Sequence, residues 1–564
     1  MSAAAVFPSW AMLEPFVFRR DDSSSFPDKT TAPIRASATT SLGAPFRVAF
    51  VFADPPRVSR LYAHLPGFPD PNQETPLAIL GTHRHLVLLR VATQTSTWRT
   101  VQDFFVYSAD DPSELRLLPP CTEPFVEFFR RHYSSSSSEE ESEEESEEEG
   151  APANRRRLDV MSMGIVTRGE GEQDFAVVEL TLFKPRRCTE VHADICLFRS
   201  SSSLDAMPPA PGSTQLVDGE WDSMRVPIVH SDQDDAWEQL SSWQTDAVVP
   251  VGRWLCWIDY HGGILFLDVF GPGPTTPTVS FLGLPLVKFK FPSDHDRSKA
   301  CSRLYRVVTP IHGGRALKFV HVDRNDHVGY GPLRFGGEFT ITCHTLQLGS
   351  VDVLNKSTLG SLVWRKDSTV TCHELWAANP PKLLPRVILM LPLVNIDRPH
   401  VVHFLFSDFK YALKKMWVVA IDMSTNKVES FSKYVNGRDD IGSVDADLTE
   451  ERSTDPWPFL PCEFSKYLSM SSRRPSTEGQ PAAAARKKLV KVEQEQRAIV
   501  DRLPGESFGW CPDDGGTIVD VLAELGVDGE ELEGYRANYA ACVANFRKLH
   551  EEKGYAMVEV DDDD

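Results

Sequence analysis

The sequence has few of the features that assign a protein to a class directly. Its ten cysteines fall singly and none belongs to a C-x-x-C pair, which removes the usual zinc and redox spacings. There is no apolar run of about 18 residues, the length that a membrane-spanning helix needs. The first residues have no basic start and are interrupted by Pro8, Glu14 and Pro15, so they make a poor signal peptide. These absences predict an intracellular protein, in the cytoplasm or nucleus, that is neither secreted nor membrane-bound.

The cysteines fit that compartment. Several lie inside apolar runs, among them Cys196, Cys256 and Cys343. Unpaired cysteines in such runs behave as small buried hydrophobic residues in a reducing environment. We therefore expect reduced, buried thiols.

Basic residues are fewer than acidic ones, and the excess of acidic residues is not spread evenly along the chain. The net charge is −21, and 18 of these negative charges come from two segments. Residues 134–149 carry nine glutamates and no base, and residues 480–564 carry ten Lys/Arg against nineteen Asp/Glu. The remaining body is nearly neutral and offers no electrostatic footprint for nucleic acid. No nucleic-acid partner is expected.

The most informative stretch of the chain is 248–285. Its apolar runs Trp254–Ile258, Ile264–Phe270 and Val279–Leu282 are separated by turn-forming residues, including His261-Gly262-Gly263. β-Branched and aromatic residues favour strands, while glycine and proline supply turn dihedrals. The stretch therefore predicts a three-stranded antiparallel meander.

Variants of this unit recur along the chain, with almost no helical periodicity before residue 434. We expect an opening strand pair over 7–18, a connection over 21–40, and later strands that include 362–364 and a third copy of the meander over 401–432. Many short strands in repeated units predict a mainly β protein, a β-propeller-like domain of about six blades; a pair of sandwiches is the alternative.

The domain organisation follows from composition. The β-domain is expected over 1–470, with a disordered acidic Ser/Glu insert at 134–157. A linker (471–485), a helical extension (486–560) and an acidic tail (561–564) come next. Three serines of the insert each precede three glutamates, a context that resembles sites of acid-directed kinases: Ser138, Ser142 and Ser146. They are candidate phosphorylation sites, and a solvated spacer is the plainer interpretation.

Candidate catalytic motifs do not withstand inspection. Gly505–Gly509 matches G-x-S-x-G but lacks the strand and helix of a nucleophile elbow. The His-Gly-Gly runs at 261–263 and 312–314 fit hairpin turns better than oxyanion holes. Residues 349–357 lack the second glycine of a phosphate loop.

Candidate metal ligands and nuclear signals are no stronger. Cys343-His344 and Cys372-His373 could supply zinc donors, but strand neighbours point to opposite faces, which favours core cysteines beside surface histidines. The basic runs at 155–157 and 486–488 are expected to be solvated surface rather than nuclear signals. No catalytic, cofactor or metal residue is predicted, and no cofactor.

The motifs resemble a known family, the plant domain of unknown function 1618, which is expanded in grasses. The residues that carry the resemblance are Arg253–Asp259, Gly263–Leu265, Asp268-Val269, Phe281 and Leu284-Pro285, with flanking matches at Pro8–Trp10, Pro55–Ser59, Leu317–Val320, Glu374–Trp376 and Trp417–Asp422. The resemblance covers about residues 8–468. It implies no assigned activity, no catalytic residues and no ligand.

The family is similar in layout to the propeller-like domains that follow F-boxes in ubiquitin-ligase receptors, but a body that begins near residue 8 leaves no room for an F-box. We expect a protein-interaction module with an unidentified protein partner and no catalytic activity. The alternatives are a hydrolase-like enzyme with its site on the propeller axis, or a substrate receptor without its own F-box. Fold alone cannot choose among them.

Overall fold

The chain divides into two units, Met1–Asp501 and Arg502–Asp564, and the computed structural model describes residues of the first. The described residues are 7–21, 26–66, 68, 77–94, 100–123, 154–168, 174–184, 191–200, 216–230, 236–270, 277–286, 302–326, 331–348, 354, 356–407, 416–434 and 457–471. Most of the expected acidic insert, with Ser138, Ser142 and Ser146, lies outside them. So do the expected linker after 471, the helical extension and the acidic tail.

The described residues are mainly β, as the sequence predicts, and fall into six groups of four strands. A nine-stranded sheet holds the first group, in the order β2-β3-β4-β1, and the second, β5-β6-β7-β8. An eight-stranded sheet holds the third, β11 to β14, and the fourth, β15 to β18; two four-stranded sheets form the fifth, β19 to β22, and the sixth, β23 to β26.

The strands of the first three groups have these bounds: β1 Ala11–Arg19, β2 Ile34–Thr39, β3 Pro45–Val51, β4 Val58–His64, β5 Leu77–His83, β6 Leu86–Gln94, β7 Thr100–Ser108, β8 Leu115–Leu117, β11 Met163–Thr167, β12 Phe175–Phe183, β13 His192–Ser200 and β14 Gly219–Val229.

The other groups comprise β15 Ala247–Val251, β16 Trp254–Ile258, β17 Gly263–Asp268, β18 Val279–Gly283, β19 Arg306–Ile311, β20 Ala316–Arg324, β21 Phe339–Gln347, β22 Trp364–Thr371, β23 Met390–Val394, β24 Val401–Ser407, β25 Met416–Asp422 and β26 Lys427–Tyr434. Outside the groups, β9 (Thr122–Glu123) pairs with β10 (Asn154–Arg155), and β27 (Leu460–Cys462) pairs with β1.

The helices in the described part of the chain are short. They are η1 Val160–Ser162, α2 Ala236–Ser241, α4 Ser302–Tyr305, α5 Lys356–Ser361, α6 Cys372–Ala378 and α7 Phe464–Ser471. Within the described ranges no helix has the length and apolar character needed to cross a membrane.

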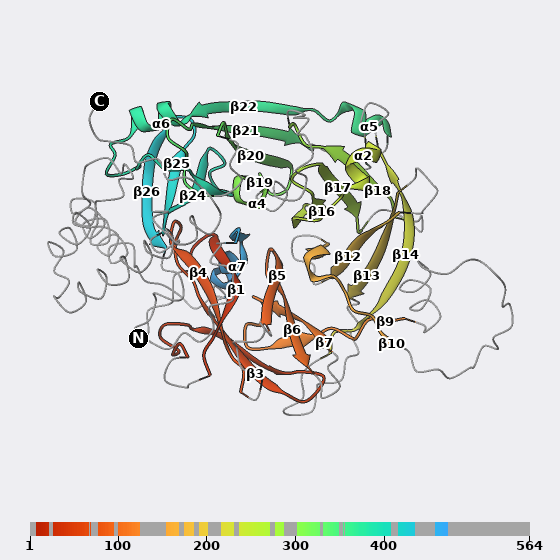
Figure 1. The fold of residues 1–564 in the computed structure, drawn as a ribbon. Helices are drawn as coiled ribbons and strands as arrows, with labels where there is room; N and C mark the ends of the chain where they lie inside the picture. The colour runs from red at the N-terminus through yellow and green to blue at the C-terminus, as the bar shows by residue number, and fades with distance from the viewer. Residues whose placement is uncertain are drawn as a thin grey trace, which may run out of the picture. The chain divides into compact units, whose positions relative to one another are not determined.

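The groups succeed one another in space as they do in sequence (Figure 1). The first strands of neighbouring groups are in contact: β1 with β5, β5 with β11, β11 with β15, β15 with β19 and β19 with β23. Each pair of successive groups also encloses an apolar core of its own. The core between the fifth and sixth groups additionally takes Trp10 and Met12 from the first. A group therefore buries its two faces against two different neighbours.

The predicted meander is confirmed and has a fourth strand. β16, β17 and β18 match the three apolar runs, and β15 pairs with β16 in front of them. The sequence of β15, AVVPV, contains a proline, which hid its strand character. The third copy is likewise confirmed as β24, β25 and β26.

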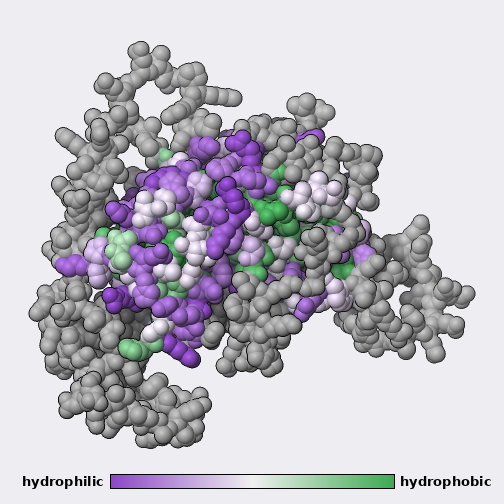
Figure 2. All heavy atoms as spheres, turned by 90° about the horizontal axis from the view of Figure 1, so that it is seen from above, coloured by the Kyte–Doolittle hydropathy of each residue, from purple (hydrophilic) through white to green (hydrophobic). Residues whose placement is uncertain are grey.

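Three local expectations are wrong. The opening stretch is one strand, β1, rather than a pair, because a register shift between Leu13 and Val17 accommodates Pro15, as β-bulges do. The expected connection over 21–40 contains β2. The expected strand over 362–364 is the start of β22, whose residues are mostly half-buried or exposed and so lack an apolar pattern. Figure 2, seen from the side of β22, shows hydrophilic side chains over much of the described surface there.

The end of the described chain returns to its beginning. Phe464 of α7 is completely buried and stacks against the rings of Phe50 (5.7 Å between centroids) and Tyr107 (5.4 Å). These two rings belong to the first and second groups. One aromatic side chain from the end of the chain therefore holds two groups together.

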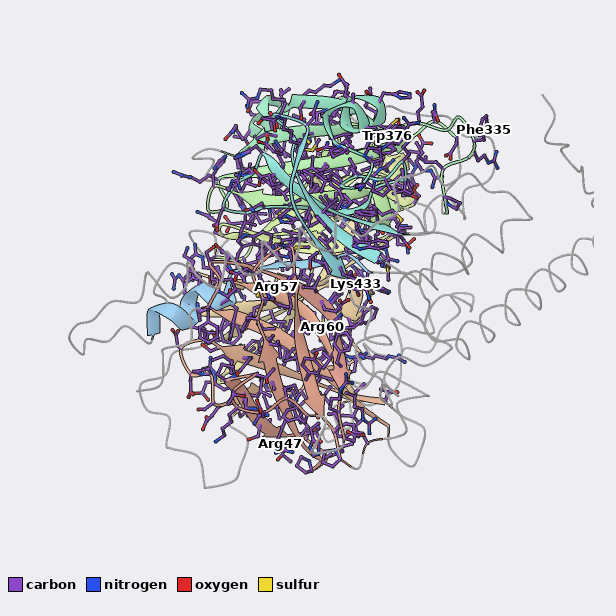
Figure 3. The ribbon with its side chains drawn as sticks, turned by 90° about the vertical axis from the view of Figure 1, so that its left-hand side faces the viewer. Arg47, Arg57, Arg60, Phe335, Trp376 and Lys433 are labelled. Carbon is purple, nitrogen blue, oxygen red and sulfur yellow. The ribbon has the colours of Figure 1, made fainter. Side chains whose placement is uncertain are left out.

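A buried polar contact joins the first group to the sixth. The hydroxyl of Tyr434, at the end of β26, donates a hydrogen bond of 2.9 Å to Oε2 of Glu14 in β1. Burial raises the pKa of Glu14 to about 7, against the opposing effects of the Arg60 charge and the Tyr434 hydrogen bond. Figure 3 places Arg60 and Lys433, the neighbour of Tyr434 in sequence, where these groups meet.

Removal of the Phe464 ring should weaken the fold. We expect Phe464→Ala to lower the free energy of unfolding by about 3–5 kcal/mol, because a large buried side chain is lost and a cavity remains. The measurement is urea denaturation followed by tryptophan fluorescence. Phe335→Ala is the matched control, because Phe335 is 110% exposed, and its effect should stay within about 0.5 kcal/mol. Equal effects of the two changes would contradict the assigned role of Phe464.

Glu14 should make stability depend on pH. Its folded-state pKa, about 7, lies above the ordinary 4.5, so the protonated form is favoured in the fold. The resulting stabilisation is complete below pH 4.5 and is lost as the pH rises through 7, a fall of up to about 3 kcal/mol. Glu14→Gln should remove this fall in urea denaturation between pH 4.5 and 7.5, whereas the exposed Glu374→Gln should retain it. A Glu14→Gln profile parallel to that of the unmodified protein would show that Glu14 titrates normally.

Candidate functional site

A cavity of about 470 Å³ lies among the first strands of the groups. Its lining is mostly apolar and comes from β5, β15 and β19, with Pro15 and Phe16 of β1 and residues 457–467 around β27 and α7. The strands β15 and β19 are edge strands of their sheets. The cavity is thus walled by two sheet edges, β15 and β19, together with β5, which lies between β1 and β6 in its sheet.

Two prolines fit these edge positions. Pro250 of β15 and Pro310 of β19 both line the cavity and are paired on one side only, with Leu255 and Leu317. Proline has no N–H to donate, so within a sheet it is restricted to edges and bulges. An edge without donors at these points does not recruit a further strand there.

The strands β15 and β19 run in the same direction, which gives the cavity two distinct ends. At their starts, Asp246 lies 3.5 Å from Nε of Arg303. Beyond their ends, a Cβ on Gly314 would lie 2.4 Å from the backbone nitrogen of Gly252, so the two turns are in direct contact. We call these the Asp246 end and the His83 end, since His83 closes β5.

The Asp246 end holds a buried carboxyl group. Oδ2 of Asp246 accepts hydrogen bonds from the backbone N–H of Tyr260 (2.9 Å) and from the hydroxyl of Ser302 (3.4 Å). Burial raises the pKa of Asp246 to about 6 despite these donors and Arg303. The Arg303 guanidinium also lies over the ring of Trp457, 5.0 Å from its centroid. This end therefore combines a titratable acid, a cation and an aromatic face.

The His83 end combines a neutral imidazole with two cations and one acid. The backbone N–H of Thr167 donates to Nδ1 of His83 at 2.9 Å, and burial lowers the pKa of His83 to about 3, so the imidazole is neutral near pH 7. Nη1 of the adjacent Arg84 is buried and has no hydrogen-bond partner within the described part of the chain. Lys466 and Glu463 of the 457–467 segment also line the cavity. Lys466 is exposed, so solvent reaches this end.

Thr309, in the middle of β19, also lines the cavity. It is completely buried, and its hydroxyl finds no hydrogen-bond partner among the residues described. A buried unsatisfied hydroxyl destabilises a fold by about 1–3 kcal/mol. The hydroxyl is therefore a group that a bound molecule could satisfy.

Of the residues singled out in the sequence, the turn at 312–314 lines the cavity, and the candidate metal ligands lie elsewhere. Cys343 and Cys372 are fully buried in one apolar core, as expected, whereas His373 is exposed and contacts Glu338 at 2.8 Å. Cys372 begins helix α6 rather than continuing a strand. No group of three or more potential metal ligands occurs within the described ranges. The G-x-S-x-G match at 505–509 lies outside them.

Other expectations have mixed outcomes. The turns at 261–263 and 312–314 are confirmed as hairpin turns between β16 and β17 and between β19 and β20. All six cysteines of the described residues are free and buried. The expected solvated surface at 155–157 is wrong for Arg156, whose side chain is 6% exposed and contacts the buried Glu179 at 2.6 Å.

The cavity residues were missed in the sequence because they are far apart in it. Asp246, Thr309 and Trp457 belong to three different segments, and none forms a local motif. The usable signals were Pro250 and Pro310, which mark their strands as sheet edges.

Comparisons with known proteins give a family model that matches part of the chain and no activity. A family model described as "Protein of unknown function (DUF1618)" matches residues 257–403. No curated protein matches the chain. Among solved structures, a mutant alpha-L-arabinofuranosidase from Fusarium graminearum in complex with an iminosugar inhibitor is 9% identical, with 70% of this chain and 92% of that chain covered and a TM-score of 0.20. A likeness this weak supports no argument.

The unsatisfied hydroxyl of Thr309 leads to a stability prediction. Thr309→Val keeps the side-chain shape and removes the hydroxyl, so the free energy of unfolding should rise by about 1 kcal/mol. In contrast, Ser59→Ala should lower it by about 1 kcal/mol, because the Ser59 hydroxyl accepts a 2.9 Å hydrogen bond from Ala53 N–H. Urea denaturation measures both. A loss of stability in Thr309→Val would show that the hydroxyl already has a partner.

Proposed function

We propose that this chain, whose residues 257–403 belong to the DUF1618 family, is a non-catalytic protein-interaction module. Its partner is a protein that presents apolar side chains next to carboxylates, and the binding site is the His83 end of the cavity. The observation that carries the proposal is the buried Nη1 of Arg84, which has no hydrogen-bond partner among the described residues and belongs to a residue lining an apolar cavity.

We further infer that the six strand groups are the blades of a propeller. Three observations support this architecture: the contacts between successive first strands, the separate core between each pair of neighbouring groups, and the pairing of β27 with β1. In a propeller the first strand of each blade faces a central channel. The cavity would then be part of that channel, and its two ends would open on the two propeller faces.

The chemistry of the cavity selects the partner. Apolar strands make up most of the wall, so burial of apolar side chains is the main source of binding free energy. At the His83 end the charged lining residues are two cations, Arg84 and Lys466, and one acid, Glu463. A guanidinium recognises a carboxylate by charge-assisted hydrogen bonds. An acidic, apolar segment therefore complements this site.

One observation favours an enzyme, the raised pKa of Asp246. Shifted carboxyl groups in cavities are frequent general acids. Hydrolysis of this type needs a second carboxylate or a histidine beside the acid. Asp259, whose charge adds to the rise in the pKa of Asp246, does not line the cavity, and the lining residues Glu463 and His83 belong to the opposite end. Binding thus accounts for more of the cavity than catalysis does.

The proposal can be tested with peptides selected from a displayed library on the purified full-length protein. We expect the selected peptides to combine apolar residues with Asp or Glu. Calorimetric titration should then show affinity reduced about tenfold or more in Arg84→Gln and in Lys466→Glu, because each removes a cation from the site. The affinity should also fall with added salt.

The matched control is Lys382→Glu, a charge reversal at an exposed lysine that does not line the cavity. It should leave peptide affinity unchanged. Peptides without acidic residues, or peptides that bind Arg84→Gln as tightly as the unmodified protein, would overturn the proposal.

A further inference from the structure

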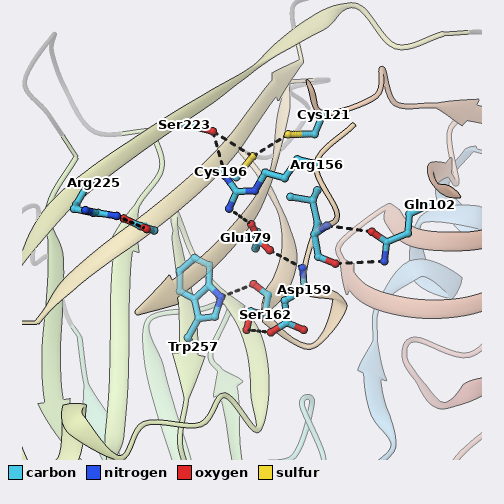
Figure 4. Close-up of polar contacts among 12 residues, drawn as sticks. Gln102, Cys121, Arg156, Asp159, Ser162, Glu179, Cys196, Ser223, Arg225 and Trp257 are labelled. Carbon is cyan, nitrogen blue, oxygen red and sulfur yellow. Dashed lines mark hydrogen bonds and ion pairs between the residues drawn. The ribbon is translucent and has the colours of Figure 1, made fainter. Parts of the chain in front are cut away.

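Two cysteines from different strand groups lie side by side. Cys121 follows β8 at the end of the second group, and Cys196 lies in β13 of the third. Their sulfur atoms are 3.3 Å apart although the residues are 75 positions apart in sequence (Figure 4). Cys121 is 7% exposed and Cys196 is completely buried. Both are free thiols.

The surroundings make the two thiols unequal. The hydroxyl of Ser223 points to Sγ of Cys196 at 3.8 Å. Either thiol could donate in the contact between the two sulfur atoms. With Cys121 as the donor, this hydrogen bond lowers the pKa of Cys196; Arg156 and Ser223 act in the same direction, and burial and Glu179 oppose them. Donors and positive charge beside a sulfur favour its thiolate, which is the reactive form. Cys196 is therefore the more readily ionised member.

Neighbouring contacts hold the pair in place. The backbone N–H of Arg156 donates to the carbonyl of Cys121 at 2.9 Å, and the Arg156 side chain contacts Glu179 of β12 at 2.6 Å. Glu179 is directly opposite Cys196 in the β12–β13 register. The Arg156–Glu179 contact thus connects the segment that carries Cys121 to the strands that carry Cys196.

We propose that Cys121 and Cys196 form a redox-sensitive pair that a peroxide converts into a disulfide. The Cys196 thiolate attacks one peroxide oxygen, the O–O bond breaks, and the sulfur becomes a sulfenic acid while the other oxygen leaves and is protonated. The Cys121 sulfur then attacks the Cys196 sulfur, the S–O bond breaks, and the oxygen leaves with the Cys121 proton as water. The two sulfurs lose two electrons, which the peroxide gains.

The disulfide would fix a particular place in the fold. Cys121 directly precedes β9, which pairs with β10, and these two strands flank residues 124–153 in sequence. The new bond would tie this two-stranded pair to β13, and so the second group to the third. A bridge across 75 positions restricts the unfolded chain strongly. Oxidation would therefore stabilise the junction from which the Ser/Glu tract departs.

The test is peroxide treatment of the full-length protein. After hydrogen peroxide, mass spectrometry of the unreduced digest should find the Cys121 and Cys196 peptides joined, lighter by two hydrogens and released by dithiothreitol. The pair should react about tenfold faster than Cys256, which is as buried as Cys196 but has its pKa raised by burial, whereas the pKa of Cys196 is lowered. The oxidised protein should melt roughly 5 °C higher or more.

Single-cysteine variants show which of the two cysteines is oxidised first by peroxide and which then forms the disulfide. Cys121→Ser should trap a Cys196 sulfenic acid that dimedone labels, and Cys196→Ser should remove both label and cross-link; Cys121→Ala serves if the serine variant folds poorly. Cys256→Ser is the matched control and should cross-link normally. The proposal is overturned if the unmodified protein shows no Cys121–Cys196 cross-link, or if Cys256 is oxidised as fast as the pair. These outcomes do not bear on the peptide site, because the variants leave Arg84 and the cavity unchanged.

Discussion

The described fold depends on strand β1, because this strand meets both the next group and the last. It pairs in parallel with β4, in antiparallel with β27, and at Phe16 with Ala78 of β5. Its Glu14 accepts a hydrogen bond from Tyr434 at the end of the sixth group. Strand β1 therefore contacts strands from the beginning and from the end of the described chain. The aromatic ring of Phe464 adds an apolar contact between the first and second groups.

The cavity follows from this arrangement. Each group buries its two faces against its neighbours, and the first strand of a group then presents an edge instead of a face. Pro250 and Pro310 remove donors from two of those edges. Since apolar side chains line most of the space, the few polar groups in it are conspicuous: a carboxyl at one end and an incompletely paired guanidinium at the other. That asymmetry is the basis of the proposed partner.

Buried polar contacts occur where strand groups meet. Arg156 and Glu179 lie at the junction of the second and third groups, next to Cys121 and Cys196. A buried ion pair gives little net stability but fixes a specific arrangement when its partners are well placed. The Arg156–Glu179 ion pair connects the segment of Cys121 to the strands around Cys196, and the two sulfur atoms lie 3.3 Å apart beside it. The same junction therefore serves architecture and, in our proposal, chemistry.

The sequence by itself determined the class of fold and most of the strands. Apolar runs broken by glycine and proline turns are local signals, so the meander of β16 to β18 could be read from residues 248–285 alone. It also indicated that cysteines in apolar runs, such as Cys196, Cys256 and Cys343, would be buried, and all six cysteines of the described residues are. It failed at β1 and β15, where Pro15 and Pro250 interrupt strands that only neighbouring strands stabilise.

Tertiary structure alone decided the candidate site and the thiol pair. Asp246, Arg84 and Thr309 line one cavity because strands of three groups meet there, and no local pattern records that meeting. The burial of Arg156 likewise depends on Glu179, which is distant in sequence. The position of a residue along its strand specifies which face of the sheet its side chain lies on. Which residue of another group that side chain contacts depends on how the groups pack together. The reactive and binding groups of this protein lie at such junctions.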